Sequence, residues 1–179
     1  YNTAIGYDAL RANTTSSNNT AVGHNSLDSN TGTENTAVGS GSLRTLSTGN
    51  YNTAVGYECL RLATTSDQNT AVGYYALGAA TTGHSNTAMG SAALDAMTTS
   101  SNNVAIGKDA LGALVTGSSN VAVGADAGAA STAVGITAVG RHALGGANTA
   151  NYNTALGSYA LASNTSGSTN VAVGRNALN

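Results

Sequence analysis

The chain has 179 residues, a formal net charge of −2 and only 8% charged residues, and it lacks proline, phenylalanine and tryptophan. Its few basic residues are scattered, which argues against a nucleic-acid partner, because phosphate binding needs clustered Lys and Arg. No run of about 18 apolar residues is present, so we expect no membrane insertion by this segment. The chain starts at Tyr1 and stops inside a repeated motif, so we expect a piece of a longer array.

A motif related to Asn-Thr-Ala-Val-Gly recurs along the whole sequence. Its closing glycine recurs every 17 residues, except for steps of 16 from Gly23 to Gly39 and from Gly124 to Gly140. This period is too short for helical repeats, and short β-branched stretches between Gly, Asn and Ser are typical of strands. The pattern therefore predicts an all-β fold, a parallel β-solenoid of about eleven 17-residue coils, as a single array over residues 1–179.

The expected strands are the triplets before each glycine, in chain order residues 3–5, 20–22, 36–38, 53–55, 70–72, 87–89, 104–106, 121–123, 137–139, 154–156 and 171–173. An irregular coil is expected at 125–139, where "STAVG" and "ITAVG" follow each other. We expect "ITAVG" to keep the strand, and residues 125–135 to form a shortened or distorted connection with a weakened core.

Alternation along a strand assigns the faces of each triplet. The third residue is always aliphatic, which favours the core, and the first is Thr or, at Val104, Val121 and Val171, Val. We expect that first position to be buried or half-buried. A second core column of leucines is expected at Leu10, Leu27, Leu43, Leu60, Leu77, Leu94, Leu111, Leu144, Leu161 and Leu178, broken only at Gly128.

The middle residue of the triplet is alanine in every copy, and alternation then predicts that it points outward. A solvated position would vary, so we expect these alanines to pack against another subunit; limited drift of a duplicated repeat is the alternative reading. The predicted interface comprises Ala4, Ala21, Ala37, Ala54, Ala71, Ala88, Ala105, Ala122, Ala138, Ala155 and Ala172. The asparagine that precedes most triplets is expected to form a stacked, hydrogen-bonded ladder.

The segments "NVAIG" at 103–107 and "NVAVG" at 120–124 and 170–174 carry a family resemblance. The repeat resembles the head repeats of trimeric autotransporter adhesins, which are left-handed parallel β-rolls of three chains. The longer form, "NTAVGxxAL…TTG", is similar to repeats of phage tail fibres and other virion-surface fibres. The resemblance implies a parallel homotrimer and an extracellular location, on a virion tail fibre or a microbial cell surface.

Tyrosine is the one enriched side chain suited to binding a host glycan or protein. Candidate ligand contacts are Tyr7, Tyr57, Tyr74, Tyr75 and Tyr159, although tyrosine covering the turn is an equal explanation. His24, His84 and His142 occupy different repeat positions, so no metal site is expected. We expect no catalytic residues, no cofactor and no enzymatic activity.

These observations favour a structural fibre or adhesin segment that spaces or presents a receptor-binding tip. The rival is an ice-binding β-solenoid, because threonine recurs at fixed spacing and pairs as in Thr64-Thr65 and Thr81-Thr82. Valine at some of the threonine positions argues against the rival if those positions face inward.

Overall fold

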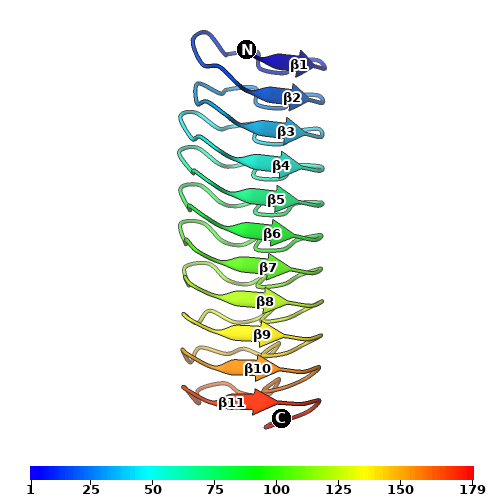
Figure 1. Ribbon diagram of the computed structural model, residues 1–179, viewed down its shortest axis with the longest axis vertical. Helices are drawn as coiled ribbons and strands as arrows, with labels where there is room; N and C mark the ends of the chain where they lie inside the picture. The colour runs from blue at the N-terminus through cyan, green and yellow to red at the C-terminus, as the bar shows by residue number, and fades with distance from the viewer.

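The structure, a computed structural model, describes residues 1–179 and is a parallel β-solenoid (Figure 1). A single sheet of eleven strands runs along one side in strict sequence order, and each strand is parallel to its neighbours. The predicted triplets are the strands: β1 Thr3–Ile5, β2 Thr20–Val22, β3 Thr36–Val38, β4 Thr53–Val55, β5 Thr70–Val72, β6 Thr87–Met89, β7 Val104–Ile106, β8 Val121–Val123, β9 Thr137–Val139, β10 Thr154–Leu156 and β11 Val171–Val173.

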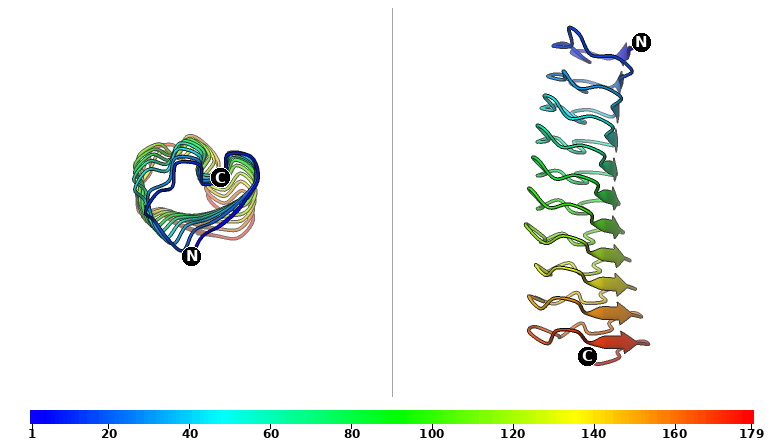
Figure 2. Two further views of the ribbon diagram at one scale, coloured as in Figure 1. Left: turned by 90° about the horizontal axis from the view of Figure 1, so that it is seen from above. Right: turned by 60° about the vertical axis from the view of Figure 1, so that its left-hand side comes forward.

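Equivalent residues of the repeat lie directly above one another. Ala71 pairs with Ala88, and the same register holds across both 16-residue steps, where Thr20 pairs with Thr36 and Val121 with Thr137. The missing residue is therefore absorbed in the turns and leaves the strands aligned. Seen along the axis, each coil is rotated slightly relative to the one before, so the sheet twists gradually (Figure 2).

The alanine at the middle of each strand points into the coil, which reverses the assignment made from the sequence. Ala21, Ala71, Ala105 and the equivalent alanines of β2 to β10 have no exposed surface, and Ala172 of β11 has 2%. Ala4 alone is exposed, because no preceding coil covers it. The flanking residues of the strands accordingly point outward, and the third position is not part of the core.

The leucine column is buried as predicted and forms the opposite wall of the core. Leu27 and Leu77 are completely buried, and Leu178 is exposed because it lies in the last coil. Another inward column, three residues after the leucine column, was not recognised from the sequence; it includes Leu46, Met97 and Leu114. These large side chains meet the strand alanines across a narrow coil, so space remains only for a methyl group on the strand side.

The asparagines form the predicted ladder inside the coil. The Oδ1 atom of Asn69 accepts a hydrogen bond from the backbone N–H of Asn86 at 2.9 Å, and its Nδ2 atom donates to the carbonyl of Gly83 at 2.8 Å. Asn86 repeats both contacts with Asn103 and Ser100. Each amide thus joins two coils and satisfies a turn carbonyl that would otherwise be buried without a partner.

Tight turns close each coil after the strand. Gly73 has a φ of +140°, and a Cβ atom there would lie 2.5 Å from the carbonyl oxygen of Gly90 in the next coil, so only glycine fits. Leu77, four residues later, adopts a left-handed φ of 53°, a conformation unusual for leucine that recurs throughout the leucine column. The repeated turn therefore imposes the same backbone strain at each level, and burial of the leucine offsets it.

The irregular coil keeps the stack continuous. "ITAVG" provides β9, as predicted, while residues 125–135 form the shortened turn. Ala133, from the extra "STAVG" copy, is buried, and Ile136 stands at the asparagine position with its side chain in the core. The asparagine ladder is therefore interrupted at this single level.

Candidate functional site: the outer face of the sheet

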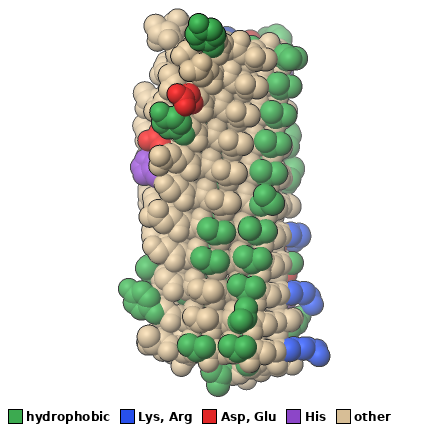
Figure 3. Space-filling view, viewed as in Figure 1, with side chains coloured by type: hydrophobic (Ala, Val, Ile, Leu, Met, Phe, Trp, Pro, Cys, Tyr) green, Lys and Arg blue, Asp and Glu red, His purple; other side chains and the backbone are tan.

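The third residue of every strand forms an aliphatic column on the outer surface. The exposed fraction is 37% for Val55, 46% for Met89 and 67% for Val173. Figure 3 shows the hydrophobic side chains as a vertical line along the solenoid. The column comprises Ile5, Val22, Val38, Val55, Val72, Met89, Ile106, Val123, Val139, Leu156 and Val173.

The first residue of each strand forms a second column beside the aliphatic one. It is threonine in β1 to β6, β9 and β10, and valine in β7, β8 and β11. The hydroxyl groups of these threonines make no hydrogen bond within the chain, although they are half-buried in most strands. We call the two columns together the outer sheet face.

The outer sheet face is more apolar towards the C-terminus. Val121 and Val171 bring aliphatic side chains into both columns, and they are 37% and 67% exposed. Figure 3 shows the second line of hydrophobic side chains in the lower half of the molecule. A monomer rarely leaves a continuous apolar strip in water, so this face has the character of a contact surface.

The prediction that the strand alanines form the outer surface of the sheet is therefore wrong. Except for Ala4 of the first coil, the alanines are enclosed by their own coil and cannot reach a second chain. The alanines do not vary because they fit a narrow interior, and the aliphatic column does vary among Val, Ile, Met and Leu because it lies outside. The sequence signal for the outer face was therefore a third strand position that varies in shape but is always apolar.

The turns that follow the strands border this face. Lys108, Arg141 and Arg175 occupy the same repeat position, one after the glycine, in the C-terminal half. Figure 3 shows the basic side chains projecting at that edge. Lys108 pairs with Asp109, and the guanidinium carbon of Arg141 lies 5.4 Å from the ring centre of Tyr159.

Three of the five tyrosines predicted to contact a ligand lie together. The rings of Tyr57 and Tyr74 are stacked with centres 5.5 Å apart, and Tyr75 meets Tyr74 edge-on at 4.5 Å. The Arg61 guanidinium carbon lies 5.3 Å from the centre of Tyr75. Although the three rings contact one another, Tyr57 and Tyr74 remain 47% and 56% exposed, so the cluster joins adjacent coils and still presents aromatic surface at the edge of the solenoid.

The other two tyrosines are isolated from that cluster. Tyr7 stacks on His24 at 5.6 Å between ring centres, and Tyr159 stacks on His142 at 5.1 Å. His142 Nε2 also lies 3.3 Å from Asp126 Oδ2. Each of these contacts joins adjacent coils, so the five tyrosines do not build a common site.

No group of three or more His, Cys, Asp and Glu residues is arranged to hold a metal ion. Burial raises the pKa of the Cys59 thiol, whose Sγ donates to the carbonyl of Gly73 at 2.7 Å. A thiol with a raised pKa is a poor nucleophile at neutral pH, so Cys59 serves packing.

The structure contains no helix that is both long enough and apolar enough to cross a membrane. Comparison of the chain with protein-family models, with curated proteins and with solved structures finds no match.

Proposed function

We propose that this chain is a structural fibre segment that assembles with parallel copies of itself through the outer sheet face. It spaces or presents a receptor-binding tip on a phage tail fibre or a microbial surface protein, and it performs no catalysis. The observation that carries the proposal is the unbroken aliphatic column outside a core that is already complete.

A second copy of the chain suits this face because its repeat must match. Each coil adds one side chain to each column, and successive side chains of a column are about 4.8 Å apart, which is the separation of neighbouring strands. A parallel copy in register has the same rise and places equivalent levels side by side. The coils with valine at the first strand position, at Val121 and Val171, would then pack against the same valines of the second chain. The threonine hydroxyls of other coils, such as that of Thr70, would form hydrogen bonds across the interface.

The face is a strip only two side chains wide, which suits chains gathered around a common axis. The resemblance to adhesin head repeats favours three chains, so we propose a parallel homotrimer with left-handed coils. Each chain would direct its outer sheet face towards the axis and leave its turns in water. Complete burial of a fully exposed aliphatic side chain is worth roughly 1.5–3 kcal/mol. Several members of the aliphatic column, such as Val38 and Val72, are already half-buried in the single chain, so each of the eleven levels would contribute part of that value.

Sedimentation equilibrium tests the proposal with matched substitutions. Val72→Glu combined with Ile106→Glu places charges within the strip and should convert the trimer to monomers. Val115→Glu is the control, because Val115 is also exposed, at 43%, but lies in a turn outside the sheet. A monomeric wild-type segment, or equal dissociation by the control variant, would overturn the proposal.

Ice binding is a second candidate that one observation favours. The threonine column faces outward with unpaired hydroxyls at regular spacing, so valine at some of these positions no longer argues against it. The neighbouring column mixes Val, Met, Ile and Leu, which does not present a uniform lattice. Thermal hysteresis of the monomeric protein, abolished by Thr70→Lys with Thr87→Lys, would favour ice binding over a buried face.

A further inference from the structure

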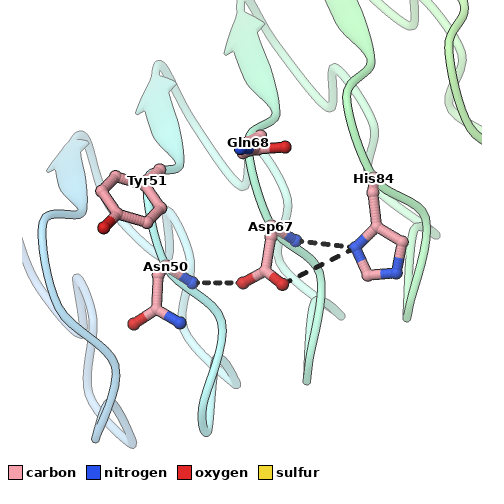
Figure 4. Close-up of a pocket in the computed structure, with 5 residues that line it drawn as sticks. All are labelled: Asn50, Tyr51, Asp67, Gln68 and His84. Carbon is pink, nitrogen blue, oxygen red and sulfur yellow. Dashed lines mark hydrogen bonds and ion pairs between the residues drawn. The ribbon is translucent and has the colours of Figure 1, made fainter.

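A shallow polar depression of about 300 Å³ lies beside the sheet, where the chain enters successive strands (Figure 4). It is lined by Asn50, Tyr51, Asp67, Gln68 and His84, which come from the turns before β4, β5 and β6. None of these residues belongs to the outer sheet face. The depression is therefore separate from the surface proposed for self-association.

One side of the depression is a ladder of side-chain acceptors. The Asn50 backbone N–H donates to Asp67 Oδ1 at 2.6 Å, and the Asp67 N–H donates to His84 Nδ1 at 3.2 Å. These bonds fix the carboxylate and require Nδ1 of His84 to be unprotonated. Asp67 Oδ2 makes no hydrogen bond and lies 3.9 Å from His84 Nδ1, so it remains available as an acceptor.

The other side carries an aromatic ring and an oriented amide. Tyr51 is 56% exposed and has no aromatic partner within the chain. The Gln68 Oε1 atom accepts a hydrogen bond from Ser85 Oγ at 3.3 Å, which leaves its Nε2 group without a partner. Figure 4 shows Tyr51 and Gln68 along one side and Asn50, Asp67 and His84 along the other.

We propose that this depression binds one pyranose unit of a carbohydrate. A sugar has an apolar C–H face for the Tyr51 ring, a hydroxyl hydrogen for Asp67 Oδ2 and a hydroxyl oxygen for Gln68 Nε2. An anion is disfavoured by the Asp67 carboxylate, and an organic cation would leave the Gln68 donor unpaired. A purely apolar ligand would desolvate both polar groups without compensation.

The same chain contains a matched site that lacks this chemistry. Tyr152 occupies the repeat position of Tyr51 and is similarly exposed, at 62%. Asn151 corresponds to Asn50, but in the following coil Ser168 and Thr169 replace the carboxylate and the amide. Tyr152 therefore supplies an exposed ring without the polar pair, and it should not bind.

Nuclear magnetic resonance titration of the whole segment tests the inference. The probes are the methyl glycosides of glucose, galactose, mannose and N-acetylglucosamine, which mimic a chain end, and β-linked disaccharides, which add an internal unit. At least one probe should shift the backbone signals of Tyr51 and Gln68, with a dissociation constant on the order of a millimolar for so small a ligand. A methyl glycoside that suffices indicates recognition of a chain end, and a requirement for the disaccharide indicates an internal unit.

Variants separate the site from general surface effects. Tyr51→Ala and Asp67→Asn should each weaken binding by about ten-fold or more, while Tyr152→Ala should leave it unchanged. Asp67→Asn retains an oxygen for the Asn50 N–H, and unchanged circular dichroism would show that the coil is intact. The inference is overturned if no probe binds, if Tyr152→Ala weakens binding as much as Tyr51→Ala, or if choline binds and the sugars do not.

Discussion

Ile136 fills the space that the absent leucine side chain at Gly128 would occupy. A Cβ atom on Gly128 would lie 3.4 Å from Ile136 Cδ1 and 2.9 Å from Leu111 Cδ2. Gly128 has a φ of 59°, close to that of the leucines at its repeat position, so the backbone could accept leucine. Two departures from the repeat, both within the irregular coil 125–139, therefore compensate one another.

This relationship predicts a strong coupling between the two positions. Gly128→Leu should lower the free energy of unfolding by about 1–3 kcal/mol through overpacking. Adding Ile136→Asn should recover most of that loss, because it vacates the space and restores an acceptor for the Asn153 N–H. Urea unfolding of both single variants and the double variant measures the coupling; strictly additive effects would show that the two side chains do not share one space.

The alanine column predicts a packing effect inside one chain. Ala71→Leu adds three carbons to a site with no exposed surface, and it should cost about 1–3 kcal/mol or prevent folding. Val72→Met is the matched neighbour, since it points outward and Met89 already occupies that column. Thermal unfolding should show a large loss for the first variant and a small one for the second; the reverse order would place alanine outside.

The asparagine ladder predicts a large penalty for a small truncation. Asn69→Ala removes the acceptor for the Asn86 N–H and the donor to Gly83, which leaves buried polar groups without partners. The expected loss is about 2–6 kcal/mol, at 1–3 kcal/mol for each of the two orphaned groups. Thr82→Ala, at an exposed turn position, should change stability by less than about 0.5 kcal/mol in the same denaturation measurement.

The buried thiol of Cys59 predicts a pH dependence with a definite sign. Burial raises the pKa of Cys59 in the folded chain, so the unfolded chain loses this proton at a lower pH. The contribution to stability is therefore complete below the ordinary thiol pKa and declines as the pH rises above it. Cys59→Ala, which introduces the residue found at this position in several other coils, should remove that component from the stability profile; identical alkaline profiles would contradict the assignment.

The sequence was sufficient to predict the period, the strand positions, the asparagine ladder and the leucine column, because each depends on repetition along the chain. It did not predict the direction of the Thr-Ala-Val triplet. Hydrophobicity favours valine inside and alanine outside, but the large side chains of Leu46, Leu77 and Met97 already fill the narrow interior. Only the three-dimensional width of the coil decides that alanine fits and that valine must point outward.

The candidate surfaces were harder to predict for a related reason. The tyrosines were identified because the chain contains several of them at one repeat position, but their count did not show that Tyr57 and Tyr74 stack on each other. The depression is lined by two turn positions that recur 17 residues apart, and the residue at each position differs from coil to coil: Asn50 is followed by Asp67, and Tyr51 by Gln68. The consensus sequence of the repeat omits residues that differ between copies, so it could not reveal this combination. The stacking of adjacent coils brings the ring, the carboxylate and the amide together.

Because equivalent residues of the coils stack in register, recombination between gene copies could lengthen or shorten this molecule by whole repeats. Loss of residues 69–85 would join equivalent positions and shorten the fibre by one step of about 4.8 Å while keeping every column continuous. The irregular coil 125–139 is the exception. A loss that removes Ile136 but keeps Gly128, such as loss of residues 136–152, would leave the Gly128 space empty, so these two residues should be gained and lost together.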